Sequence, residues 1–361
     1  MTSPSFVLPP PAPAEPRSTV WPLWVVYVAA AGCGLTILVG SVGPTVAQVP
    51  ALTAASALLF GAFGVVCTWL LSRIHYFRPL GRDAKILAAL WGSFVAIGFA
   101  LPANQAIYQH FVERGDTQAW SLFAPFTEEP MKDLGIVVVL LLAATRPRTA
   151  LDGLVVGSFV GLGFEVVENV VQSINNAIAS SPSGHPSQWA SLATDVIHEV
   201  LRRSWTGHIV ITGIAGFGIG YAMTAHRRSV VHRWTVASAL VLLAGAGHLL
   251  WNSHRFGVFY VVGQFGMLAA YLWLIRIGRA EEGRLYPPYL SYVAPSLVES
   301  AVTQSLATAP ARRACRRASS CTREQQRTTA RLAAAIGNGD VGTAHECAER
   351  LSALGTPTPG G

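Results

Sequence analysis

Apolar residues gather into eight long runs along the chain, and short polar stretches separate them. Each run approaches the roughly 20 residues that an α-helix needs to cross a bilayer. The pattern predicts an all-α, polytopic membrane protein, a helix bundle with about eight transmembrane helices. The predicted spans are approximately 21–42, 51–71, 86–107, 120–144, 151–174, 205–225, 234–252 and 256–277.

The two ends of the chain lie outside this pattern. Residues 1–20 are rich in proline and predict a disordered N-terminal tail. Residues 278–361 contain a basic stretch and a Gly/Pro-rich end, and they predict a partly disordered, cytoplasmic C-terminal tail. The helical domain is therefore expected to cover residues 21–277.

Composition supports a membrane protein. Hydrophobic residues make up 51% of the chain and charged residues only 12%, whereas a soluble domain carries about 25% charged residues. The net charge of +7 comes from basic residues in short loops and in the C-terminal tail. This distribution fits membrane orientation better than nucleic-acid binding, so we expect the lipid bilayer, and no nucleic acid, as a partner.

The placement of basic residues also predicts orientation. The loops after the second, fourth and sixth spans carry nine Lys and Arg residues, and the alternate loops carry four. Because basic loops stay in the cytoplasm, both termini are expected to be cytoplasmic in a bacterial plasma membrane. The glycine-rich runs 153–163 and 213–220 lie inside spans and predict close helix contacts, not a phosphate loop. We therefore expect no nucleotide.

Charged residues near the start of the fourth span are the most informative exception to the apolar pattern. Glu128 and Glu129 are adjacent, and Lys132 follows at helical spacing, where its ammonium can neutralise either carboxylate. An unpaired charge deep in a bilayer costs several kcal/mol, so an ionisable cluster inside a span indicates a functional site.

Three further polar clusters interrupt later spans. The fifth span carries Glu165, Glu168 and Asn169 on one helical face, the sixth begins near His208, and the seventh ends near His248 and Asn252. Because successive spans cross the membrane in opposite directions, all four clusters fall in the same leaflet. The charge distribution assigns them to the extracytoplasmic side.

Two histidines and several carboxylates at one depth predict a metal or water-activating site. Imidazole and carboxylate suit zinc, commonly with three protein ligands and an open position for water, and a bound divalent metal would make that water a nucleophile. Without a metal, a glutamate would act as general base, with His248 and Asn252 stabilising an oxyanion. The chain contains no HExxH motif, so the site is not of the zincin type.

The clusters also resemble the PrsW family of intramembrane proteases, which is similar to the membrane proteases that process CAAX proteins and bacteriocins. The resemblance covers about residues 20–277 and is carried by four motifs in order: Glu128-Glu129-x-x-Lys132, Phe164-Glu165-x-x-Glu168-Asn169, His208, and His248-x-x-Trp251-Asn252. It implies an endopeptidase that cuts a membrane-anchored regulatory protein, such as an anti-sigma factor, near the extracytoplasmic side.

The resemblance implies roles for the polar residues. Glu128 or Glu129 would activate water, His208 and His248 would be metal ligands or polarising groups, and Asn252 would support the water or the oxyanion. We add Glu168 to the catalytic candidates and Glu165 to the candidate ligands of a divalent metal, with zinc preferred. Lys132, as a counter-ion, and Asn169 complete the predicted set as supporting residues.

Other interpretations of the same residues stay open at this point. The carboxylates and histidines could form a proton relay in a proton-coupled transporter, although the chain shows no internal repeat. They could also form an interhelical hydrogen-bond network in a non-catalytic membrane scaffold.

Overall fold

The computed structural model describes residues 20–75, 80–115, 119–142, 147, 149–180, 186–200, 207–253 and 257–285, and a few single positions between 328 and 347. All regular structure in these residues is helical, which confirms the predicted all-α class. Residues 1–19 of the predicted N-terminal tail, and most of the predicted tail 278–361, lie outside the described residues.

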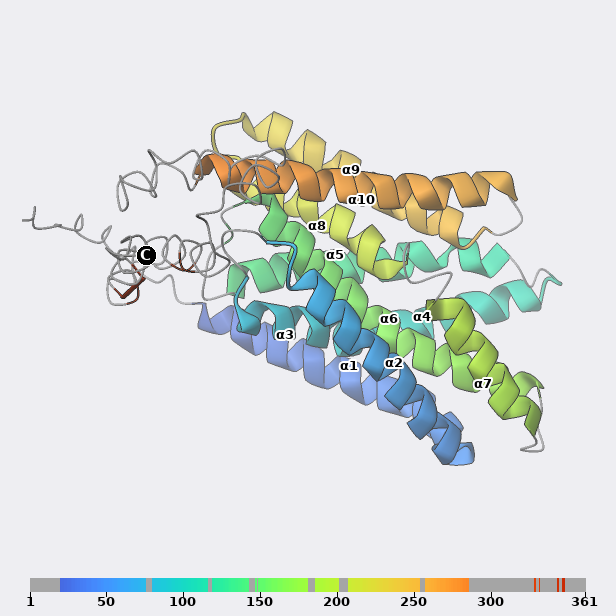
Figure 1. Cartoon of the computed structure of the whole chain (residues 1–361). Coiled ribbons are helices and arrows are strands. Elements are labelled where there is room, and N and C mark those ends of the chain that lie inside the picture. The colour runs from blue at the N-terminus through green and yellow to red at the C-terminus, as the bar shows by residue number, and fades with distance from the viewer. Residues whose placement is uncertain are drawn as a thin grey trace, which may run out of the picture. The chain divides into compact units, whose positions relative to one another are not determined.

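The chain order of the elements follows the hydrophobic runs (Figure 1). The elements are α1 (Trp21–Gln48), α2 (Pro50–Leu71), α3 (Arg82–Leu90), the π-helical turn η1 (Trp91–Ala96), α4 (Ile97–Val112), the 3-10 turn η2 (Ala119–Leu122), α5 (Ala124–Leu142), α6 (Ala150–Ser180), α7 (Pro186–His198), α8 (His208–Thr224), α9 (Val230–Trp251) and α10 (Val258–Leu285). Each predicted span corresponds to one helix, with two exceptions. The third is α3, η1 and α4 in continuous succession, and the fourth begins in η2 and continues in α5. Helix α7 has no counterpart among the predicted spans.

The chain divides into two compact units. One unit, Val20–Ile74 with Leu80–Arg276, contains the helix bundle. The other unit includes His75 and the chain from Ile277 onward, and within it His75 Nδ1 lies 2.7 Å from Glu282 Oε1.

Six helical stretches in the described residues are long and apolar enough to cross a membrane. They are α1, α2, the continuous stretch Arg82–Val112, α6, α9 and α10. Helix α8 is apolar but has only 17 residues, and α5 carries Glu128, Glu129, Lys132 and Asp133 among its 19 residues. Two helices that fall short of a full apolar span, α5 and α8, therefore carry two of the four polar clusters.

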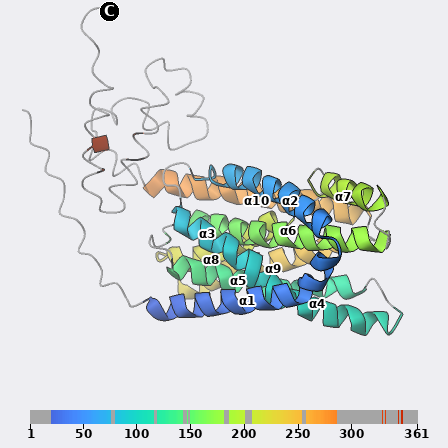
Figure 2. The same ribbon diagram turned by 90° about the horizontal axis from the view of Figure 1, so that it is seen from below.

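Helix α6 is the central element of the bundle (Figure 2). In its most apolar window, 89% of the residues are buried, and α8 packs along it. The glycines Gly153, Gly157 and Gly161 repeat every fourth residue on α6, and a methyl group at any of them would collide with the α8 backbone at Gly216, Thr212 or His208, respectively. Small residues let membrane helices approach closely where side chains would hold them apart. The glycine stripe therefore sets the distance between α6 and the first residue of α8, His208.

The π-helical turn η1 positions α5. Its first residue, Trp91, is 1% exposed, and the indole ring lies against Gly135, where any side chain would collide with it. The indole Nε1 donates a hydrogen bond of 2.9 Å to the carbonyl oxygen of Met131. Because Met131 lies between Glu129 and Lys132, this contact fixes the helical turn that carries the charged cluster.

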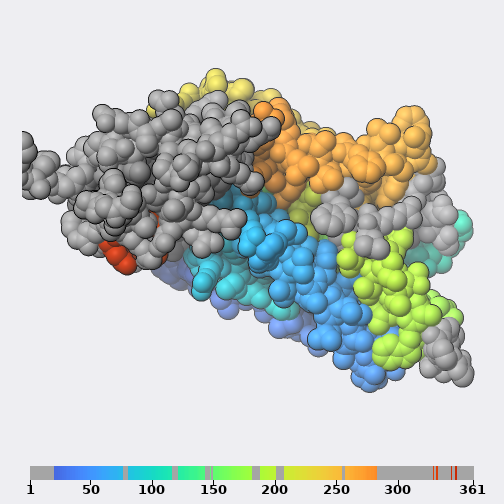
Figure 3. Space-filling model, viewed as in Figure 1, coloured from blue at the N-terminus to red at the C-terminus, as the bar shows by residue number. Residues whose placement is uncertain are grey.

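Helix α7 lies beside α2 on the surface of the bundle (Figure 3). Leu192 of α7 packs with Leu52 of α2 and Ala177 of α6 in a small apolar cluster. This cluster fixes α7 against the C-terminal part of α6.

Candidate active site

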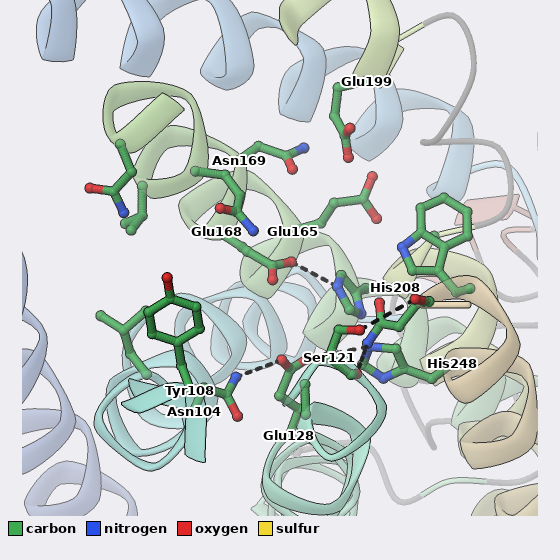
Figure 4. A pocket seen from close by; sticks show the side chains of 18 of the residues that line it. Asn104, Tyr108, Ser121, Glu128, Glu165, Glu168, Asn169, Glu199, His208 and His248 are labelled. Atoms are coloured by element: carbon green, nitrogen blue, oxygen red, sulfur yellow. Dashed lines mark hydrogen bonds and ion pairs between the residues drawn. The ribbon is translucent and has the colours of Figure 1, made fainter. Parts of the chain in front are cut away.

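A cavity of about 430 Å³ brings the polar clusters together (Figure 4). Its lining includes residues of all four clusters: Glu128, Glu165, Glu168, Asn169, His208, His248 and Asn252. They come from α5, α6, the start of α8 and the end of α9, the elements that the depth of the clusters in the sequence indicated.

The charged cluster on α5 forms a buried ion-pair network. Lys132 Nζ lies 3.0 Å from Glu128 Oε2 and 2.9 Å from Glu129 Oε1. The ammonium is fully buried and also lies 2.9 Å from Nδ1 of His208. Two buried carboxylates therefore share one ammonium, which links α5 to α8.

Each of the two imidazoles is paired with a carboxylate. His208 Nε2 lies 2.8 Å from Glu168 Oε2, and His248 Nδ1 lies 2.7 Å from Glu129 Oε1. The second nitrogen of His248, Nε2, is 3.7 Å from Glu128 Oε2. The ring centroids of His208 and His248 are 4.9 Å apart, edge to face. Carboxylates that pair with imidazoles in this way fix the tautomer and orientation of metal-binding histidines.

The centre of the cluster fits a divalent metal. Ligand atoms of Glu128, Glu129, His208 and His248 all lie within 4.8 Å of one another, and all four residues are buried. In addition, Glu129 Oε2 is buried without a hydrogen-bond partner among the described residues. A buried carboxylate oxygen without a partner costs free energy, and a cation in this cluster would remove that cost.

The other predicted residues lie around this centre. Glu165, outside the group of four, accepts a hydrogen bond of 3.3 Å from the backbone N–H of Ile209 through Oε2, close to the start of α8. The Nδ2 of Asn252 donates to the carbonyl oxygen of Ser121 at 2.7 Å, so one of its two amide protons is already engaged. Asn169 lines the cavity one helical turn beyond Glu165.

The sequence predictions missed Asn104, which contacts the charged cluster directly. Asn104 of α4 donates from Nδ2 to Glu128 Oε1 at 2.9 Å, and its Oδ1 accepts a hydrogen bond from Thr127 Oγ1. Asn104 therefore supports Glu128 from the side opposite Lys132. The sequence contained one feature that could have indicated Asn104: it is an amide residue inside an apolar span, at the depth of the other clusters.

Comparison with known families agrees with this geometry. A family model described as PrsW family intramembrane metalloprotease matches residues 82–275, more than half of the chain. The chain belongs to the PrsW family. The match includes every residue of the cavity lining. No curated protein and no solved structure gave a match.

Membership in the PrsW family makes this chain a multi-pass, membrane-embedded protease with a membrane-embedded protein as substrate. The buried group of glutamates and histidines fits the metal site of a metalloprotease. The family match favours this interpretation over a proton-coupled transporter and over a non-catalytic scaffold.

Proposed function

We propose that the cavity is the active site of a zinc-dependent endopeptidase. The observation that carries the proposal is the buried group of Glu128, Glu129, His208 and His248, whose ligand atoms lie within 4.8 Å of one another. Imidazole and carboxylate donors suit zinc. A bound zinc ion would act as a Lewis acid and activate a water molecule for attack on a peptide carbonyl.

The metal would be held by His208, His248 and one carboxylate. To bind it, Nδ1 of His208 would exchange its 2.9 Å contact with the Lys132 ammonium for the metal. The geometry favours Glu129 over Glu165 as this third ligand, because Glu129 belongs to the compact group and has a buried oxygen without a partner. Glu165 contacts the backbone at the start of α8, which suits a residue that holds His208 in place. Glu168 would orient His208 through their 2.8 Å contact.

Glu128 is proposed as the general base. It is the member of the Glu128–Glu129 pair that lines the cavity, and Asn104 and Lys132 hold its two carboxylate oxygens. It would accept a proton from the attacking water and transfer it to the departing peptide nitrogen. Asn252 lines the same cavity, and its second amide proton would stabilise the developing oxyanion.

Substitution of each glutamate tests these roles separately. Purified Glu128→Gln is expected to retain bound zinc and to lose cleavage of a single-span substrate, whereas Glu129→Gln is expected to lose both. Glu113→Gln, at an exposed position after α4, serves as the control. The assignment would be wrong if Glu128→Gln and Glu129→Gln both cleaved the substrate at the wild-type rate.

We further propose that the substrate is a membrane-anchored regulatory protein, such as an anti-sigma factor, and that it is cut near the extracytoplasmic side of a bacterial plasma membrane. The distribution of basic loops supports this orientation, with both termini in the cytoplasm. In a cysteine-free background, a membrane-impermeant thiol reagent applied to intact cells should label Glu113→Cys and leave Arg228→Cys unlabelled. The reverse pattern would place the cavity on the cytoplasmic side.

A further inference from the structure

The part of the cavity away from the histidines is lined by carboxamides. Among the Asn and Gln residues that the structure describes, seven line this cavity and four lie elsewhere. Those in the cavity are Asn104, Gln105, Asn169, Gln172, Asn175, Asn176 and Asn252, and those elsewhere are Gln48, Gln109, Gln188 and Gln264. So strong a segregation in an apolar bundle indicates a common role.

The carboxamides form two facing walls. On α6, Asn169, Gln172 and Asn176 continue the helical face of Glu165, at intervals of three or four residues. On α4, Asn104 and Gln105 lie one turn before Tyr108, which also lines the cavity. Figure 4 shows Asn104 and Tyr108 across the cavity from Glu168 and Asn169. The amide-lined walls therefore lead directly to the carboxylates and histidines.

Several of these amides have unused hydrogen-bonding capacity. The side chains of Gln105, Gln172 and Asn175 are exposed and make no hydrogen bond to any residue that the structure describes. Asn169 is only 6% exposed, and its Nδ2 has no partner among the same residues. A buried amide without a partner costs about 1–3 kcal/mol, which a ligand with matching polar groups would offset.

An unwound peptide is a ligand with matching groups. A protease must open the substrate helix around the bond that it cuts, and each opened residue exposes an N–H and a C=O that are costly to leave unpaired in a membrane. Many proteins bind extended peptides by adding them to the edge of a β-sheet, but the described part of this chain has no strand. A carboxamide offers both a donor and an acceptor, as a peptide group does.

We propose that Gln105, Asn169, Gln172 and Asn175 bind the backbone of an unwound, extended substrate segment beside the scissile bond. The inference rests on the proposed active site and adds how the substrate is held there. From Asn169 to Asn175 the α6 wall is about 9 Å long at 1.5 Å per residue. This length matches about three residues of extended chain. Recognition of backbone groups would make helix opening, more than side-chain identity, the basis of substrate selection.

The test uses photo-crosslinking, which requires no cleavage. The photoreactive amino acid p-benzoylphenylalanine replaces Tyr108, an exposed aromatic residue on the cavity wall, in full-length protein that also carries Glu129→Gln. Three synthetic single-span peptides serve as probes. One is a continuous Leu/Ala helix, the second has a Gly-Pro pair near one end of the span, and the third adds backbone N-methyl groups at the three residues after that pair.

The second peptide is expected to label at least 10-fold more than the first. The third should label weakly, because it is unwound but cannot donate backbone hydrogen bonds. Gln172→Met with Asn175→Leu keeps similar side-chain volume without amides and should reduce labelling by the second peptide about 10-fold. Gln109→Met, on α4 outside the cavity, should leave labelling unchanged.

Two results would overturn the inference: equal labelling by the first two peptides, including none by either, or full labelling in the Gln172→Met/Asn175→Leu variant. Neither result depends on hydrolysis. Failure of the proposed active site would appear separately, as cleavage that survives in Glu128→Gln and Glu129→Gln protein.

Discussion

Replacement of Gly161 by alanine is expected to inactivate the protease through the position of His208. The added methyl group would lie 2.6 Å from the carbonyl carbon of His208 and closer still to its oxygen. Ordinary contacts of this kind begin at 3.4 Å, so the backbones of α6 and α8 must separate by about 1 Å. His208 is the first residue of α8 and moves with that backbone.

The expected effect on activity exceeds the effect on stability. Overpacking of this size costs about 1–3 kcal/mol of folding free energy, whereas a displacement of about 1 Å at a catalytic group lowers the rate about 100-fold. Purified Gly161→Ala should therefore remain folded in detergent, with kcat/KM for a single-span substrate reduced about 100-fold. Its affinity for zinc should fall as well.

Two glycines provide matched controls. Gly153→Ala meets the same α8 backbone about 12 Å further along α6, so it should lose similar stability and retain more activity. Gly245→Ala has no atom within 4 Å of the added methyl group and should behave as the wild type. Wild-type kcat/KM in Gly161→Ala, or equal inactivation by Gly153→Ala, would refute a role for this contact in positioning His208.

Three other predictions concern the same site. Lys132→Met leaves two buried carboxylates without their ammonium and should lower the free energy of unfolding in detergent by about 3–5 kcal/mol. Replacement of the other lysine, Lys85→Met, should lower it much less. Similar stability of the two variants would contradict the ion-pair network. Trp91→Phe removes the hydrogen bond to Met131 and should lower stability by about 1 kcal/mol, while Trp234→Phe, at an exposed position, should be neutral. Zinc should raise the melting temperature of the chelator-treated wild type but not that of His248→Ala, and an equal rise in both would argue against His248 as a ligand.

Much of the architecture could be predicted because a helix that crosses the hydrocarbon layer needs about 20 mostly apolar residues. Each of the eight apolar runs corresponds to helix in the structure. Equal depth placed Glu128, His208 and His248 in the same layer, and they line one cavity. Depth in the membrane restricts which residues can meet, since helices in a bundle are held nearly parallel.

The pairing of individual atoms could not be predicted in the same way. Helical spacing allowed Lys132 to reach either glutamate, and in the structure it contacts both and His208 as well. The contact of Asn104 with Glu128 depends on the rotation of α4 after the π-helical turn η1, which hydropathy does not report. Helix α7 is too short and too polar for the hydropathy pattern to predict it as a span. Its position beside α2 was therefore known only from the structure.

The unusual composition of α5 has a consequence for biosynthesis. With four charged residues in 19, this helix is a poor signal for insertion by the translocon, where each central charge opposes partitioning into lipid by about 2.5–3.5 kcal/mol. It emerges from the ribosome before α6, α8 and α9, whose side chains later enclose its charges. A nascent chain that ends after α5 is therefore expected to be retained at the translocon or degraded, and proteolytic competence can arise only when the second half of the bundle has been synthesised.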